Sequence, residues 1–184
     1  MELEEKTITS KRIYDGKVVH LLEDTALLPN GKICTREVIM HPGAVCIAAL
    51  TDENELLMVR QFRYAFKEEL LEIPVGKLEA GEDPKECGIR ELREETGAVA
   101  KEFEVINKIY PSPGYSNEVI HIYFARDLSF ENQQLDDDEF LKVEKIPFDK
   151  AVEMVHKGQI KDAKTIIAIL GLDFFKTAVI IANR

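Results

Sequence analysis

The chain has 184 residues, of which 45% are hydrophobic and 32% charged, and such a composition is typical of a globular protein able to bury a core. Its formal net charge of −10 argues against a nucleic-acid partner, because nucleic-acid binding requires a basic surface. The sequence has no apolar run near the roughly 18 residues of a membrane span, and its acidic start, Met-Glu-Leu-Glu-Glu-Lys, does not resemble a signal peptide, so we expect a cytoplasmic protein with no membrane partner.

Residues 1–43 are expected to form a small antiparallel β unit. The segments 14–17 and 29–32 contain Asp-Gly and Asn-Gly, which are strong hairpin signals. Strand-like segments follow them at 18–22 and 33–39. A meander of this size cannot bury both of its faces unaided. We therefore expect it to pack against the main domain or against a second subunit.

Residues 44–184 are expected to form the main domain. The continuously apolar run 44–50 is typical of a central strand that is buried on both faces. The composition of 110–117 requires a loop. Further strands are expected at 56–63, about 103–109, about 118–126 and about 140–146, and helices at about 148–157 and from 162 onward. A mixed sheet flanked by helices, α+β in class, is the simplest arrangement.

A short helix ending at Gly97 has the strongest chemical signal in the sequence. Asp83 suits its N-cap, a proline follows at the first helical position, and glycine suits a left-handed stop. Glu91, Glu94 and Glu95 are three and four residues apart, so they share one face. They are either a solvated acidic face with internal ion pairs or ligands for a divalent cation, Mg²⁺ above all, acting on substrate phosphates.

The spacing of the surrounding residues favours the metal-binding interpretation. Gly76, five residues, Glu82, seven residues and then Arg-Glu-Leu-Arg-Glu-Glu-Thr-Gly at 90–97 is similar to the Nudix box, and every fixed glycine, glutamate and arginine matches. The final position of the motif is normally a larger aliphatic residue, whereas this chain has Ala98 followed by Val99. The resemblance implies a Nudix-type α/β/α sandwich. It also implies a hydrolase that cleaves nucleoside diphosphates linked to another group, using water and divalent metal.

Three further segments resemble the ADP-ribose pyrophosphatases of this family: 60–63, 72–76 and 112–118. A proline about fifteen residues past the box marks that subfamily, and Pro113 lies fifteen residues after Ala98. The resemblance implies hydrolysis of ADP-ribose to AMP and ribose 5-phosphate. Two alternatives stay open: a pyrophosphatase for another nucleoside diphosphate sugar, such as GDP-mannose, or a nucleotide-binding Nudix module without catalysis.

The resemblance also implies roles for individual residues near the helix. Glu91, Glu94 and Glu95, with the carbonyl of Val75, would bind two or more Mg²⁺ ions, with Mn²⁺ as an alternative. Arg63 would contact phosphate, for which a planar guanidinium with two parallel donors is well suited.

The rest of the substrate site is implied to come from two other segments. Ser112, Gly114 and Glu118 would line the terminal ribose. Arg36 and Glu37, in the β unit, would reach across a homodimer to the adenosine side of the partner's site.

Two assignments stay open. Tyr14 would either stack on adenine or serve as a core aromatic residue. Glu139, at the end of the acidic run 136–139, is our choice for the base that takes a proton from the attacking water, with Asp137 as second choice and a merely solvated loop as the alternative. The cysteines have no metal-ligand spacing and are expected to be reduced thiols: Cys34, Cys46 and Cys87.

Overall fold

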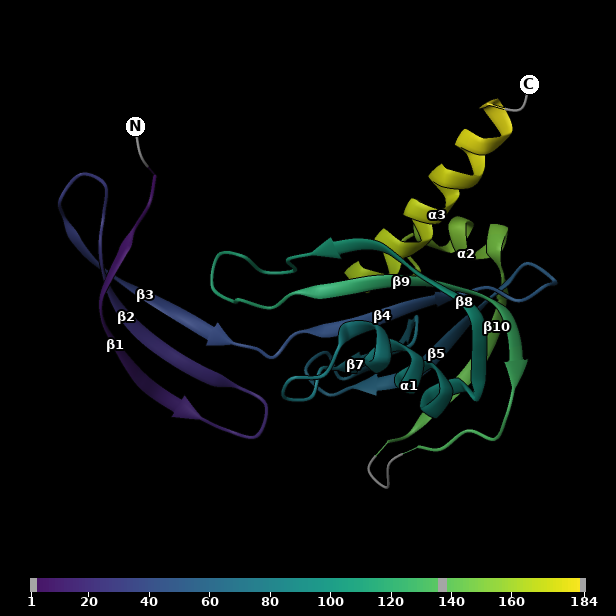
Figure 1. Cartoon of the computed structure of the whole chain (residues 1–184), viewed down its shortest axis with the longest axis horizontal. Coiled ribbons are helices and arrows are strands. Elements are labelled where there is room, and N and C mark those ends of the chain that lie inside the picture. The colour runs from purple at the N-terminus through teal and green to yellow at the C-terminus, as the bar shows by residue number, and fades with distance from the viewer. Residues whose placement is uncertain (1–2, 136–138, 183–184) are drawn as a thin grey trace. The chain divides into compact units, whose positions relative to one another are not determined.

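The computed structural model describes residues 3–135 and 139–182, with side chains up to residue 174 (Figure 1). The chain divides into two compact units. The first unit contains residues 1–43 together with 110–119, and the second contains 44–109 and 120–184. The segment 110–119 therefore belongs with the N-terminal strands, although it connects two strands of the second unit.

The first unit is an antiparallel sheet in the order β1-β2-β3. Its strands are β1 (Lys6–Asp15), β2 (His20–Leu27) and β3 (Ile33–Met40), and their pairing confirms both predicted hairpins. The loop 110–119 attaches to the end of β3, where the Ile39 N–H donates to the Tyr115 carbonyl at 2.7 Å. Every residue of β1 is exposed, so the sheet buries little apolar surface by itself.

The described residues of the second unit form two sheets and three helices. One sheet has the order β7-β4-β9-β8 and the other the order β10-β5-β6. The strands are β4 (Ala44–Ala49), β5 (Glu55–Arg63), β6 (Glu68–Glu72), β7 (Val75–Lys77), β8 (Ala98–Ile109), β9 (Ile120–Phe130) and β10 (Leu141–Pro147), and the helices are α1 (Pro84–Thr96), α2 (Phe148–His156) and α3 (Ala163–Ala182). Because β4 and β9 are parallel whereas the other pairs are antiparallel, the sheet is mixed and the α+β class is confirmed.

The central strand β4 is buried along its whole length, as predicted. Alternate residues of a strand point to opposite faces of its sheet. Cys46 and Ala48 pack in a core with residues of α2 and α3, whereas Val45, Ile47 and Ala49 pack in a core with residues of α1. The helices therefore cover both faces of the sheet, as expected for an α/β/α sandwich (Figure 1).

The strands β8 and β9 are longer than the sequence predicted. β8 begins at Ala98, directly after α1, rather than near residue 103, and β9 continues to Phe130. The cause is their mutual pairing, which runs from Ala98 opposite Phe130 to Ile109 opposite Ile120.

The predicted reduced cysteines are confirmed as free thiols. Within the described part of the chain, no helix combines the length with the apolar character that crossing a bilayer requires.

Candidate active site

The ends of α1 are formed by the residues that the sequence indicated. The Asp83 side chain accepts hydrogen bonds from the backbone N–H groups of Lys85 (2.8 Å) and Glu86 (3.3 Å). Gly97 has φ of 71°, in the left-handed region, and its N–H donates to the Arg93 carbonyl. This conformation ends the helix and turns the chain directly into β8, which begins at Ala98.

The carboxylates of α1 meet the backbone of β7, and we call Gly76, Glu91, Glu94 and Glu95 the carboxylate site. Glu95 is 3% exposed and its Oε2 accepts a hydrogen bond from the Val75 N–H at 3.0 Å. Glu91 lies directly over Gly76, because a Cβ at position 76 would be 1.8 Å from its Cδ. Only glycine therefore allows the Glu91 carboxyl group to lie this close to β7.

Arg90 links the two less buried carboxylates of the site. Its Nη1 donates to Glu91 Oε1 and to Glu94 Oε2, each at 2.9 Å. Its Nε and Nη2 donate to both oxygens of Glu82, at 3.0 and 3.1 Å. Arg90 thereby ties the loop before α1 to the helix, and this contact lowers the pKa of Glu82 to about 2.

Two carboxyl groups of the site, Glu95 and Glu91, have raised pKa values. Burial raises the pKa of Glu95 to about 8; the Val75 N–H opposes this rise, whereas the charges of Glu91 and Glu139 add to it. Burial also raises the pKa of Glu91, against the opposing charge of Arg90. A cation placed between these groups would favour their charged forms.

The donor set fits a hard divalent cation, because it consists of carboxylate oxygens beside a backbone strand. Within residues 3–135 and 139–182, no three acidic, histidine or cysteine side chains are arranged to hold a metal ion as they stand. Glu91 and Glu94 point to Arg90. Metal binding would therefore require these two side chains to rotate from the guanidinium to the ion.

Arg63 lies near the carboxylate site and is held by a residue that the sequence analysis missed. Its Nε and Nη2 donate to the two oxygens of Glu72 at 2.5 and 2.7 Å. This pairing leaves Nη1 as the nitrogen that Glu72 does not contact. The charge of Arg63 opposes the rise that burial causes in the pKa of Glu95, so the two groups are close enough to interact. The only sequence signal for Glu72 was its place in the segment 72–76.

The loop that leads to Glu139 is attached to the C-terminal end of α1. The Glu131 N–H donates to the Gly97 carbonyl at 2.7 Å, and the Gln133 side chain donates to the carbonyl of Glu95. Glu139 is exposed, and its charge raises the pKa values of Glu91 and Glu95. Asp137 lies outside the described residues.

The predicted sugar-contacting residues belong to the first unit. Ser112 and Gly114 lie in the loop 110–119, where the Ser112 carbonyl accepts the Tyr115 N–H. In the same loop, Glu118 Oε1 lies 3.7 Å from His41 Nδ1.

The predicted adenosine-contacting residues lie on or beside the strands of the first unit. Arg36 forms a two-pronged ion pair with Glu5, at 2.8 and 2.9 Å, and Glu37 is exposed. Tyr14 is 59% exposed, so the interpretation as a core aromatic residue is wrong, and stacking on adenine stays a prediction.

Replacing Gly76 with alanine is expected to lower kcat/KM by about 10²-fold, because displacing a catalytic group by about 1 Å has an effect of this size. The new Cβ would overlap the Glu91 carboxyl group and push it away from β7. Steady-state kinetics would measure the loss. Gly171→Ala, in α3, is the control, because a Cβ there meets no atom within 4 Å. Unchanged kinetics in Gly76→Ala would contradict the placement of Glu91.

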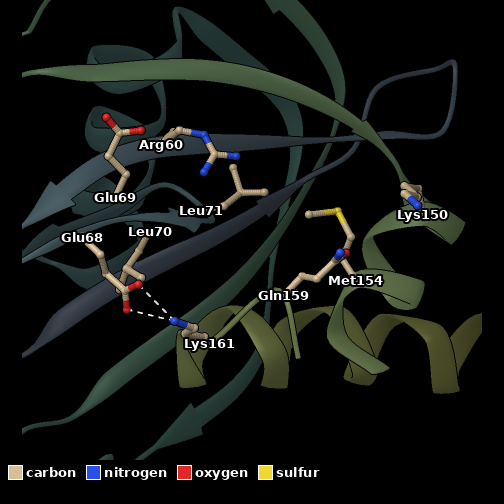
Figure 2. A pocket seen from close by; sticks show the side chains of 9 residues that line it. All are labelled: Arg60, Glu68, Glu69, Leu70, Leu71, Lys150, Met154, Gln159 and Lys161. Atoms are coloured by element: carbon tan, nitrogen blue, oxygen red, sulfur yellow. Dashed lines mark hydrogen bonds and ion pairs between the residues drawn. The ribbon is translucent and has the colours of Figure 1, made fainter. Parts of the chain in front are cut away.

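A cavity of about 450 Å³ lies elsewhere in the second unit (Figure 2). It is lined by Arg60, Glu68, Glu69, Leu70, Leu71, Lys150, Met154, Gln159 and Lys161. None of the predicted site residues is among them. Each of its three cations already pairs with a carboxylate: Arg60 with Glu144, Lys150 with Glu153, and Lys161 with Glu68. The positive charges of this cavity are therefore neutralised within the protein, which does not favour it as an anion site.

Comparison with known proteins gives matches to both parts of the chain. The NUDIX domain matches residues 40–168, and the nucleoside diphosphate sugar hydrolase N-terminal domain matches residues 5–39. The chain is 45% identical to the ADP-ribose pyrophosphatase of Bacillus subtilis (strain 168), over 91% of each chain. It is 43% identical to the methanol dehydrogenase activator of Bacillus methanolicus, over 90% of this chain and 91% of that protein. The crystal structure of an ADP compounds hydrolase has a similar fold, with a TM-score of 0.86, 20% identity and coverage of 97% of each chain.

Proposed function

Because this chain belongs to the NUDIX domain family, we propose that it is a divalent-metal-dependent pyrophosphatase that hydrolyses ADP-ribose to AMP and ribose 5-phosphate, with Mg²⁺ as its metal. The observation that carries the proposal is the buried carboxyl group of Glu95, which lies beside Glu91 with its pKa raised to about 8. Such a site gains most from a bound cation. The choice of ADP-ribose is supported by the likeness, over nearly the whole length, to the Bacillus subtilis pyrophosphatase.

The residues of the second unit would bind the metal ions and the diphosphate of the substrate. Glu91, Glu94 and Glu95, with the carbonyl of Val75, would hold two or more Mg²⁺ ions. When bound, the metal activates water and neutralises charge on the diphosphate. Arg63 would donate from Nη1 to a phosphate oxygen, because Glu72 occupies the other edge of its guanidinium.

The residues of the first unit would select the rest of the substrate. Ser112, Gly114 and Glu118 would line the terminal ribose, and the Glu118 carboxylate would accept hydrogen bonds from sugar hydroxyls. Arg36 and Glu37 would reach the adenosine side of the partner's site in a homodimer.

A homodimer is supported by the sheet of the first unit, which exposes large apolar side chains such as Ile8 (52%), Ile13 (47%) and Ile33 (67%). A second subunit would remove such surface from water. The free cysteines agree with a reducing compartment, and we place the enzyme in the cytoplasm.

The proposal is tested by incubating the purified protein with ADP-ribose, GDP-mannose and other nucleoside diphosphate sugars, each with Mg²⁺ or Mn²⁺. We expect AMP and ribose 5-phosphate as products, with the highest kcat/KM for ADP-ribose. Preferential cleavage of GDP-mannose would retain the chemistry and reject the substrate. Binding of these compounds without cleavage of any of them would favour a non-catalytic module instead.

Replacing Glu139 with glutamine is expected to lower kcat by about 10²-fold to 10⁴-fold, the range of general-base catalysis. Glutamine cannot accept the proton of the attacking water, whereas substrate binding should change little. Measurement of kcat and KM across pH would test this, since a base also gives the rate its acidic limb. If Asp137→Asn had the larger effect, the base would be Asp137 and our choice of Glu139 would be wrong.

A further inference from the structure

A cluster of buried charged residues lies behind Arg63, on the side away from its Nη1. Glu72, 1% exposed, accepts hydrogen bonds from Arg63 and also from the Lys164 ammonium at 2.5 Å. Lys164 donates in addition to Asp162 Oδ1 at 2.7 Å, and its side chain is only 12% exposed. The charges alternate along a chain from Arg63 through Glu72 and Lys164 to Asp162.

The segment 162–165, at the start of α3, also binds the backbone between β6 and β7. Asp162 Oδ2 accepts from the N–H of Thr165 at 2.9 Å and from its hydroxyl at 2.5 Å, which caps the start of α3. The fully buried Thr165 hydroxyl oxygen accepts the Ile73 N–H at 3.0 Å. The beginning of α3 therefore contacts both the side chain of Glu72 and the backbone of the next residue.

The stretch 72–76 connects this cluster with the carboxylate site. After Ile73, the Pro74 carbonyl accepts the Ile47 N–H of the central strand at 2.9 Å. The Val75 N–H then donates to Glu95, and Gly76 lies under Glu91. A shift at the start of α3 would therefore be transmitted to the backbone that contacts the carboxylates.

A buried ion cluster adds little net stability, because the cost of removing charges from water offsets their attraction. It does restrict geometry, since two-pronged pairing holds a guanidinium in one plane. Burial opposes the charge of Lys164, but Asp162 and Glu72 together hold its pKa above the ordinary value, so the lysine stays protonated. A protonated Lys164 in turn keeps Glu72 charged and oriented, and the two oxygens of Glu72 pair with Nε and Nη2 of Arg63.

We propose that Lys164 and Asp162 are positioning residues for Arg63, holding Glu72 so that the guanidinium presents Nη1 to the diphosphate of the substrate. This inference rests on the proposed function, in which Arg63 binds phosphate. Neither Lys164 nor Asp162 touches the substrate in this arrangement. Lys164 acts on the reaction through Glu72 and Arg63, whereas Asp162 also binds Thr165, whose hydroxyl accepts the Ile73 N–H.

The first test is Lys164→Met, which keeps an unbranched side chain up to the ε position and removes the ammonium group. We expect kcat/KM for ADP-ribose to fall tenfold or more, on the order of one charge-assisted hydrogen bond, mostly through a higher KM. Lys161→Met is the matched control, because this lysine also pairs with a glutamate, Glu68, but is 58% exposed. Lys164→Arg, which keeps the charge, should recover part of the loss. Wild-type kinetics in Lys164→Met would overturn the proposal.

A double-mutant cycle separates positioning from a merely structural role. If Lys164 acts through Arg63, Lys164→Met should cause no further loss of kcat/KM in a protein that already carries Arg63→Ala. An equal fold-loss in both backgrounds would overturn the proposal. Should Lys164→Met fold poorly, Asp162→Asn can replace it in the same double-mutant cycle. Its expected loss of kcat/KM is smaller, because Glu72 would still pair with both Arg63 and Lys164.

A readout independent of turnover is the NMR signal of the Arg63 Nε–H proton, which is hydrogen-bonded to Glu72 at 2.5 Å in the wild type. We expect it to be slow to exchange with water in the wild type and in Lys161→Met, and fast in Lys164→Met. An unchanged signal would overturn the proposal even if ADP-ribose is the substrate. A wild-type protein that cleaves no nucleoside diphosphate would overturn the proposed function, while the signal would still decide whether Lys164 fixes the guanidinium.

Discussion

Replacing Glu95 with glutamine is expected to lower kcat by about 10³-fold, at the upper end of the loss seen when one strong electrostatic contact is removed from an active site. The substitution is nearly isosteric, and the amide oxygen can still accept the Val75 N–H that now donates to Oε2. What it removes is the negative charge of the most buried member of the carboxylate site. Steady-state kinetics and a thermal unfolding curve would separate lost chemistry from lost folding.

Glu86→Gln is the matched control for this substitution. It makes the same chemical change on the same helix, at an exposed position. We expect wild-type kinetics from it and an unfolding temperature close to that of the wild type. Near-normal turnover in Glu95→Gln would show that this carboxylate does not serve the reaction, and our assignment of the metal site would be wrong.

Removing divalent metal is expected to abolish turnover and to leave a protein whose stability falls as pH rises toward about 8, the raised pKa of Glu95. The folded pKa lies above the unfolded one, so over this range the folded state holds a proton that the unfolded state has released. The free energy of unfolding therefore decreases with rising pH. Glu91, whose pKa burial also raises, contributes in the same direction.

Adding Mg²⁺ should reverse this loss of stability. At a concentration one hundred times its dissociation constant, a ligand of the folded state adds about 2.7 kcal/mol to the free energy of unfolding. The gain should be larger at pH 8 than at pH 6, because the metal competes with protons for the carboxylates. Thermal unfolding of the wild type and Glu95→Gln, with EDTA or Mg²⁺ at both pH values, would measure it. An equal Mg²⁺ effect in both proteins would place the metal elsewhere.

The local features of the carboxylate helix were predictable because their causes lie close together in the sequence. An aspartate cap and a terminal glycine determine where α1 begins and ends, and both formed as expected. The period of the helix also determines which side chains share one face, namely those three and four positions apart. The roles of Ser112, Gly114, Glu118, Arg36 and Glu37 stay predictions, because they concern a substrate and a second subunit.

The contacts of Arg63 could not be predicted in this way. Lys164 and Glu72 are 92 residues apart in the sequence, and neither belongs to a repeating pattern that would reveal their contact. A lone lysine and a lone glutamate are usually solvated, so the sequence favours surface positions for both. The fold instead buries Glu72 and pairs it with two cations.

By itself, the amino-acid sequence determined the class of fold, the limits of α1, the central buried strand and the Nudix box, because capping, periodicity and fixed spacing act over short stretches of chain. Only the tertiary structure decided which groups meet around the carboxylates: Gly76 beneath Glu91, the Val75 N–H on Glu95, and Glu72 between Arg63 and Lys164. The physical reason is that burial and the proximity of charges depend on how distant segments pack. These same two factors determine the pKa of Glu95 and the pairing of Arg63 with Glu72.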